Sequence, residues 1–271
     1  MKNVVLQQLA EYIYEFCGID YLKNLHSLET KIANRLKELN LSLWEYCGYI
    51  KMEEKEKDIL VELITVNETY FFREENLLNE LQTVIFPKYK ERTKGKPLRI
   101  WCAACSSGEE PYTLAMLIKE TKLFGEGSVE IVASDINKKV LKKAQNALYH
   151  KKSLSFRKMP EGMIEKYFEE IGEDYKVKEE IRELVKFKNL NMFDKYVESE
   201  IGEVDIILCR NVLIYFDIEA IKKVARTFKN ILNTTGYLFL GHAETITNIN
   251  PGFQTIYTAS IFYYKKGENQ V

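Results

Sequence analysis

Apolar residues recur every three or four positions through residues 4–63, the spacing at which one face of an amphipathic helix is buried. Four such stripes follow one another along the chain: Val5, Leu9, Ile13 and Phe16; Leu28, Ile32, Leu36 and Leu39; Leu43, Tyr46, Cys47 and Ile50; Ile59, Leu60, Leu63 and Ile64. Gly18 and Asn40 are of the types at which helices commonly end. The pattern therefore predicts a small all-helical domain over residues 1–63.

After Arg73 a longer amphipathic helix is predicted, and from residue 98 onward short apolar runs alternate with helical patterns. The predicted strands are 98–104, 129–134, 206–209 and 237–241, and the predicted helices are 112–122, 138–149 and 219–232. Alternation of this kind predicts a mostly parallel sheet with helices on both faces. The runs 253–257 and 260–265 predict a closing antiparallel hairpin. Residues 64–271 are therefore expected to form one α/β domain.

One stretch, from about residue 155 to residue 188, interrupts this alternation. Within it, residues 175–187 alternate apolar and charged side chains, as a solvated β-hairpin does. We interpret the stretch as a small antiparallel β insertion on the sheet domain.

Composition narrows the class of protein. A chain of 271 residues can bury a full core, and its net charge of −1 argues against a broad nucleic-acid surface. No apolar run is long enough to span a bilayer and no signal-peptide pattern is evident, so membrane insertion is not expected. The five cysteines lack the spacing of a disulfide framework, which favours the reducing cytoplasm.

Cys102 and Cys105 form a C-x-x-C pair, which in other contexts marks a redox or zinc site. No second pair of cysteines or histidines follows at ligand spacing. We therefore interpret the two cysteines as small residues at the end of a buried strand, and we predict no metal site.

The segment LRIWCAACSSGEEPY, residues 98–112, carries the most information about chemistry. It predicts a buried strand, a turn of small residues and a helix that opens at Pro111, and the next predicted strand leads to Asp135. In a nucleotide-binding unit such a turn brings backbone N–H groups to the ligand, and the acid binds the ribose hydroxyls. Because Gly108 is its only glycine, the turn does not match the dinucleotide fingerprint G-x-G-x-x-G. A nucleoside without phosphates fits better, and S-adenosylmethionine is the common one.

Further motifs stand in order along about two hundred residues of the chain. They are TVNETYFFR at 65–73, AACSSGEEPY at 103–112, SD at 134–135, NLN at 189–191, CRNVLIYF at 209–216 and GHAE at 241–244. Together they resemble the chemotaxis receptor methyltransferase family, CheR. The resemblance implies a Rossmann-like, class I S-adenosylmethionine-dependent methyltransferase fold with a helical domain ahead of it. It also implies methyl transfer to glutamate side chains on cytoplasmic chemoreceptor domains in chemotaxis adaptation, with S-adenosylhomocysteine as the product.

Methylation of glutamate needs no general base, because a carboxyl group with a pKa near 4.3 is already ionised at pH 7. The tasks of the site are to orient the carboxylate and to exclude water. A guanidinium can hold a carboxylate with two hydrogen bonds, and the resemblance implies that Arg73 and Tyr215 lie near the transferred methyl group. Outside these motifs, Arg73 would be a solvated arginine and Tyr215 a core aromatic residue.

Cofactor contacts are predicted partly from position and partly from the resemblance. Asp135 suits the ribose hydroxyls, although it could also cap the following helix. Glu109 could meet the methionine ammonium group, although an acid at this place also complements a helix dipole. The cofactor-binding residues that the resemblance further implies are Asn67, Thr69, Arg73, Asn191, Met192, Cys209 and Arg210. His242 and Glu244 are expected to make structural hydrogen bonds.

Lys31 and Arg35 lie one turn apart, opposite the apolar stripe of their helix, so a shared exposed face is expected. The resemblance makes them candidate contacts to acidic receptor helices, and a simple solvated face is the alternative. Some relatives bind a receptor tail as an added strand on the inserted hairpin. Here the connection over 169–175 is short, so we expect no tethering of this kind, and we expect a monomer.

Two other functions stay open from the sequence. One is a methyltransferase for RNA or a small molecule, although amino-directed nucleic-acid enzymes usually carry Asn/Asp-Pro-Pro-aromatic where this chain has CRNV. The other is a regulator that binds the cofactor without turnover, and the presence of Arg73 and Tyr215 argues against it. We therefore expect a protein-glutamate O-methyltransferase.

Overall fold

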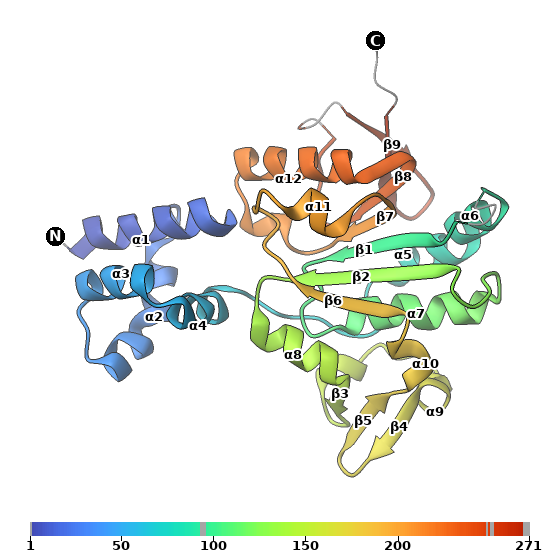
Figure 1. Ribbon diagram of the computed structural model, residues 1–271, viewed down its shortest axis with the longest axis horizontal. Coiled ribbons are helices and arrows are strands. Elements are labelled where there is room, and N and C mark those ends of the chain that lie inside the picture. Colours follow the sequence, from blue (N-terminus) through green and yellow to red (C-terminus); the bar gives the residue numbers. More distant parts are fainter. Residues whose placement is uncertain (1, 93–95, 248, 250–251, 268–271) are drawn as a thin grey trace.

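Residues 2–92, 96–247, 249 and 252–267 are described by the computed structural model (Figure 1). The four predicted N-terminal helices are present as α1 Lys2–Cys17, α2 Leu25–Leu39, α3 Leu43–Met52 and α4 Glu54–Ile64. Their apolar stripes meet in a core of their own, in which Leu28, Ile32 and Tyr46 are fully buried. None of the helices in the described ranges combines the length and the hydropathy of a membrane span.

Helices α1 and α2 of this N-terminal module end where the sequence predicted. Asn40 follows α2 in the left-handed conformation, with φ of 54°, and its N–H donates to two carbonyls of the last turn. Gly18 follows α1 with φ of 77°. Both predicted stops are confirmed. Helix α4 ends at Ile64, and the division of the chain into domains 1–63 and 64–271 stays a prediction.

A seven-stranded sheet forms the centre of the remaining chain. Its strands are β1 Leu98–Ala103, β2 Val129–Asp135, β6 Val185–Asn189, β7 Val204–Cys209, β8 Leu232–Leu240, β9 Phe253–Tyr257 and β10 Phe262–Lys266. They stand in the order β6-β2-β1-β7-β8-β10-β9. The first five strands in this order run parallel to one another, and β10 is antiparallel to both β8 and β9. The predicted closing hairpin is confirmed, with its second strand next to β8. The order reverses between β1 and β7, the place where open α/β sheets bind ligands.

Helices cover both faces of the sheet, with α11 and α12 on one face and α7, α8 and α10 on the other (Figure 1). Their bounds are α7 Glu109–Thr121, α8 Lys138–Asn146, α10 Glu179–Arg182, α11 Val197–Ile201 and α12 Ile218–Ile231. Ahead of β1 run α5 Glu75–Glu80, a π-helical turn over 81–85 and α6 Phe86–Arg92. Neighbouring strand residues point to opposite faces. Thus Trp101 packs in one buried cluster and Ile100 in the other.

A small antiparallel sheet of order β3-β5-β4 lies below the large sheet in Figure 1. Its strands are β3 Leu148–His150, β4 Phe168–Ile171 and β5 Asp174–Val177, and a 3₁₀ turn at 154–156 and α9 Met163–Tyr167 stand between the first two. The predicted antiparallel β insertion is therefore present. Helix α8 ends at Asn146 rather than at 149, because Ala147 adopts a left-handed conformation and residues 148–150 pair with β5.

The hairpin predicted over residues 175–187 is wrong in its second half. Residues Val185–Asn189 form β6, the edge strand of the large sheet, and pair in parallel with β2. The insertion therefore does not extend to residue 188. An edge strand alternates apolar and charged residues just as a free hairpin does, so the pattern alone could not tell the two apart.

Candidate active site

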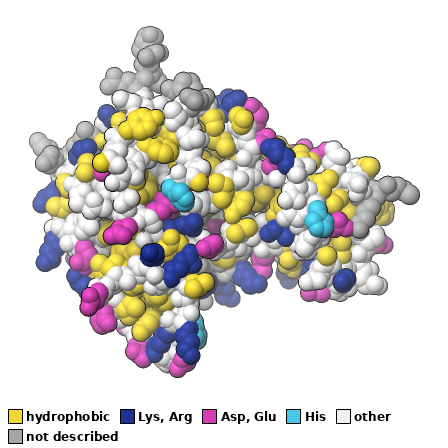
Figure 2. Space-filling view, turned by 180° about the vertical axis from the view of Figure 1, so that it is seen from behind, with side chains coloured by type: hydrophobic (Ala, Val, Ile, Leu, Met, Phe, Trp, Pro, Cys, Tyr) yellow, Lys and Arg dark blue, Asp and Glu magenta, His cyan; other side chains and the backbone are white. Residues whose placement is uncertain are grey.

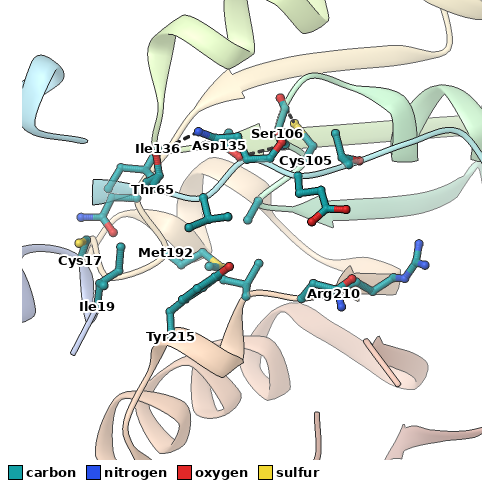
Figure 3. Close-up of a pocket in the computed structure, with 18 of the residues that line it drawn as sticks. Cys17, Ile19, Thr65, Cys105, Ser106, Asp135, Ile136, Met192, Arg210 and Tyr215 are labelled. Carbon is teal, nitrogen blue, oxygen red and sulfur yellow. Dashed lines mark hydrogen bonds between the residues drawn. The ribbon is translucent and has the colours of Figure 1, made fainter. Parts of the chain in front are cut away.

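A cavity opens at the carboxyl ends of β1, β2 and β7, where the strand order reverses (Figure 3). The empty space within it and its open mouth together measure about 1000 Å³. Its walls come from the end of α1, from residues 64–73, and from the loops that follow β1, β2, β6 and β7. Polar groups from distant parts of the chain therefore converge on one space.

The turn between β1 and α7 forms one wall of this cavity. Ala104 and Ser106 have positive φ angles, 58° and 50°, which residues with a Cβ rarely adopt. Gly108 has φ of 94°, and a Cβ there would lie 2.8 Å from the Cβ of Ala144 in α8. Glycine is needed at this position because the turn packs directly against α8.

Asp135 ends β2 and lines the cavity with a buried carboxylate (Figure 3). Its Oδ2 accepts the N–H of Ser106 at 2.8 Å, and its Oδ1 accepts the N–H of Asn137 at 2.8 Å. Burial raises the pKa of Asp135 to about 6, against the effect of these backbone donors. The N-cap of α8 is Asn137. Asp135 is therefore not the helix cap that the sequence left possible, and each of its oxygens keeps a lone pair for a ligand hydroxyl.

The two adjacent acids at the start of α7 have different surroundings. Glu109 is fully buried outside the cavity lining and accepts hydrogen bonds from the hydroxyls of Ser107 at 2.7 Å and Ser155 at 2.8 Å. Glu110 lines the cavity and accepts a hydrogen bond from Arg210 at 2.8 Å. Burial raises the pKa of Glu110, and Arg210 opposes the rise. Glu110, rather than the predicted Glu109, thus faces the ligand space, because one residue along a helix turns a side chain by about 100°.

Arg210 connects Glu110 to the segment that carries Arg73. Its buried guanidinium donates to the backbone carbonyl of Arg73 at 2.7 Å, and a carboxylate oxygen of Glu74 lies 3.3 Å from it. Phe72 and Glu74, on either side of Arg73, have φ angles of 58° and 61°. Such strained backbone persists only where its surroundings hold it. Arg210 is one of the groups that hold it here.

The N-terminal module supplies a wall of the cavity. Cys17 and Ile19 line it (Figure 3). Asn191, from the loop after β6, donates to the backbone carbonyl of Phe16 at 2.6 Å. No N-terminal residue was predicted here, since no local signal marks the end of a helix as the wall of a distant cavity.

Tyr215 lies in the 3₁₀ turn at 213–215, and its side chain lines the cavity (Figure 3). Its backbone carbonyl accepts the N–H of Asp20 at 3.0 Å, which ties it to the N-terminal module. Burial raises the pKa of Tyr215, and the neighbouring Arg73 opposes the rise. The hydroxyl is therefore neutral near pH 7 and can both donate and accept a hydrogen bond.

Most of the predicted site residues meet in this cavity. Those that line it are Asn67, Thr69, Arg73, Asp135, Asn191, Met192, Arg210 and Tyr215. Cys209 is buried at the end of β7 and, like Glu109, does not line it. Lining residues that the sequence analysis did not single out include Thr65, Glu68, Ser106, Glu110 and Phe193.

Glu244 has the structural role that the sequence predicted. Its carboxylate accepts the backbone N–H groups of Gly241, Asn211 and Val212, at 2.7, 2.7 and 2.8 Å. These bonds join the end of β8 to the loop after β7. His242 is also held, by a 3.1 Å contact from its Nδ1 to Glu74.

Lys31 and Arg35 do not present the exposed face that was expected. Both are half-buried and turn toward α4: Lys31 Nζ donates to the carbonyl of Leu63 at 3.2 Å, and Arg35 donates to both carboxylate oxygens of Glu56, at 2.9 and 2.6 Å. Burial lowers the pKa of Lys31, and the bonds to Glu56 raise that of Arg35. The side of α2 that packs on α4 is wider than its apolar stripe, so charged residues beside the stripe are drawn into the contact.

Comparison with known proteins bears directly on this cavity. The family model described as "CheR methyltransferase, SAM binding domain" matches residues 67–262. Chemotaxis protein methyltransferase 2 of Vibrio cholerae is 30% identical, over 95% of this chain and 91% of that protein. A chemotaxis protein methyltransferase of Borreliella burgdorferi is 34% identical, over 96% of this chain and 93% of that protein. The chain belongs to the CheR methyltransferase family.

Membership of the CheR family confirms the resemblance read from the motifs, the class I fold, and S-adenosylmethionine as cofactor. This CheR-family chain is a methyltransferase, as its motifs predicted. Among solved structures, the rRNA methyltransferase aviRa of Streptomyces viridochromogenes has a TM-score of 0.44 and 14% identity, covering 74% of this chain and 87% of its own. A likeness so distant says nothing about the substrate.

Proposed function

We propose that this chain transfers the methyl group of S-adenosylmethionine to glutamate carboxylates on the cytoplasmic domains of chemoreceptors, acting in the cytoplasm as a monomer. The observation that carries the proposal is that Arg73 and Tyr215 line the same cavity as Asp135 and Glu110. A group suited to an acceptor carboxylate thus stands beside groups suited to the cofactor. The names of the V. cholerae and B. burgdorferi relatives agree with it.

The polar and apolar groups of the cavity fit S-adenosylmethionine. Asp135 would accept the ribose hydroxyls, and Glu110 would accept the methionine ammonium group. The apolar Met192 and Ile136 would contact the adenine ring, and Asn191 would hold its edge. Asn67, Thr69, Arg73 and Arg210 complete the proposed contacts. When bound, the cofactor supplies a methyl group on a positively charged sulfur.

The residues of the chain have to orient the acceptor and remove its water. The acceptor glutamate is ionised at pH 7, so no side chain needs to take its proton. Arg73 would hold one carboxylate oxygen and leave the other directed at the methyl group. The neutral hydroxyl of Tyr215 would help to fix that geometry. Opposite charges neutralise each other during transfer, so a drier cavity lowers the barrier.

The proposal is tested with the purified chain, radiolabelled S-adenosylmethionine and membranes that bear chemoreceptors. Base-labile label on the receptors is the expected result, because carboxyl methyl esters hydrolyse in alkali. Cofactor binding without transfer to any acceptor would favour a regulator. Alkali-stable label, or label on RNA, would point to a different acceptor.

A further inference from the structure

Two arginines lie against the ring of one tyrosine beside the cavity. The guanidinium carbon of Arg157 lies 3.7 Å from the centre of the Tyr70 ring, and that of Arg73 lies 5.5 Å from it. Arg73 lines the cavity, whereas Arg157 does not, and about 30% of the Arg157 side chain is exposed. The second arginine therefore stands outside the cofactor space, next to an arginine that lines it.

Arg157 belongs to the segment of the small β insertion and follows Arg73 by 84 positions in the sequence. It directly follows the 3₁₀ turn at 154–156, whose Phe156 stacks on Phe71 at 5.4 Å between ring centres. The N–H of Phe71 donates to the carbonyl of Ser155 at 2.9 Å. The Ser155 hydroxyl in turn donates to Glu109. Glu109, which does not line the cavity, thus helps to fix the segment that carries Arg157.

In the free protein, the carboxylate of Glu68 forms an ion pair with the guanidinium of Arg157. Arg157 donates to it at 2.7 Å, and the Glu68 side chain is 66% exposed. Arg73 donates to the backbone carbonyl of the same residue at 3.0 Å. An exposed ion pair of this kind contributes little to stability and is easily exchanged. Another carboxylate can therefore replace Glu68 at little cost.

On the face shown in Figure 2, basic side chains gather near the middle of the molecule with acidic ones around them, above the lobe that contains the small sheet. The arginine pair supplies two planar donor forks, one of them ordered by stacking on Tyr70 before any ligand binds. A preordered fork loses less entropy when it binds a carboxylate than a free lysine does. Two such forks suit a surface that offers two carboxylates.

Resting on the proposed function, we propose that Arg157 is a specificity residue for the receptor. It binds a second carboxylate of the substrate helix, next to the acceptor glutamate that Arg73 holds. Glu68 stands in for that carboxylate until the receptor arrives. The enzyme thereby selects glutamates with an acidic neighbour on the same helix face. Lys31 and Arg35 bind groups of α4, whereas Arg73 and Arg157 lie together beside the cavity.

The test is the initial rate of methylation of a chemoreceptor cytoplasmic fragment by Arg157→Gln. We expect its KM for the receptor to rise about fivefold or more, with kcat and the KM for S-adenosylmethionine unchanged. Lys186→Gln is the matched control. It removes the same charge from an exposed pair with Glu130 on β2, away from the carboxyl ends of the strands, and should leave all three constants unchanged.

Glu68→Gln sharpens the test, because it removes the stand-in carboxylate. It should lower the receptor KM in the parent protein and have no such effect in the Arg157→Gln background. A receptor KM that Arg157→Gln does not raise overturns the inference, and so does a loss confined to kcat or to cofactor affinity, which would indicate a packing role. If Arg157→Gln does not fold, Arg157→Lys decides the matter, since it keeps the charge and loses the stacked fork. If the parent protein methylates no receptor, the proposed function itself fails, and this inference with it.

Discussion

Tyr215 shows how a single side chain is made ready for its proposed role. Its backbone is held by Asp20 and its hydroxyl is neutral near pH 7, so the side chain contributes an uncharged hydroxyl at a fixed place. We predict that Tyr215→Phe lowers kcat about tenfold, the effect of losing roughly 1.4 kcal/mol of transition-state stabilisation. Calorimetric affinity for S-adenosylmethionine should stay the same. An equal loss of cofactor affinity would instead assign the hydroxyl to the cofactor.

Asp135 predicts how cofactor binding depends on pH. Its pKa is raised to about 6 in the free protein, and the ribose hydroxyls bind the ionised carboxylate. The affinity for S-adenosylmethionine should therefore fall as the pH drops through 6, by up to about tenfold per pH unit. Titration calorimetry between pH 5 and pH 7.5 measures this. Asp135→Asn should bind weakly throughout, without the step.

The same shift has a consequence for stability. A carboxyl group with a folded-state pKa above its ordinary value near 3.9 binds more protons in the folded than in the unfolded chain. The contribution of Asp135 to the free energy of unfolding therefore decreases as the pH rises from about 4 to about 6. Asp135→Asn removes this part of the pH dependence.

At the scale of elements, α2 and α4 are joined by a charged contact. Glu56 is only 2% exposed, and Arg35 donates to both of its oxygens. We predict that Arg35→Ala lowers the free energy of unfolding by about 3 kcal/mol, because it leaves a buried carboxylate without its partner. Urea unfolding measures the change, and Arg35→Ala with Glu56→Gln should recover part of the loss. If Arg35→Ala is stable but methylates receptors poorly, the result would support the original hypothesis that α2 contacts the receptor.

The end of α1 packs closely against the loop after β6. A Cβ on Gly18 would lie 2.0 Å from the ring of Phe193, a residue that lines the cavity. We predict that Gly18→Ala lowers the free energy of unfolding by about 3 kcal/mol and weakens cofactor binding. Gly127→Ala is the matched control, because Gly127 has a similar φ of 71° and nothing within 4 Å. It should cost about 1 kcal/mol and leave cofactor affinity unchanged. Equal effects of the two substitutions would assign the whole cost to backbone strain.

For the whole molecule, we predict that cofactor binding and the N-terminal module are coupled. Cys17, Ile19 and Ile64 line the same cavity as the turn after β1. Saturation with S-adenosylmethionine, at one hundred times its Kd, should stabilise the folded chain by about 2.7 kcal/mol. We predict that amide hydrogen exchange slows at the end of α1 and at the end of α4, as well as around β1. Protection confined to residues beyond 64 would show that the module does not sense the cofactor.

Local patterns were sufficient for much of this protein. Helical spacing predicted α1 to α4 together with the stops at Gly18 and Asn40, and apolar runs predicted β1, β2, β7 and the closing hairpin. The motifs identified the family and most of the residues that line the cavity. These properties were accessible because periodicity, turn residues and short motifs depend on neighbours in sequence.

Tertiary structure alone decided the rest. It placed Val185–Asn189 at the edge of the large sheet, and it turned Glu110 rather than Glu109 to the cavity. It also drew Arg35 onto Glu56 and set Arg157 beside Tyr70. Arg35 and Glu56 are 21 positions apart in the sequence, and Arg157 and Tyr70 are 87 positions apart. Strand β6 pairs with β2, which is not its neighbour in the chain. The direction of the Glu110 side chain depends on how the whole of α7 is rotated about its axis. The sequence by itself determined which chemistry the chain carries, and packing between distant segments determined where each charged group points.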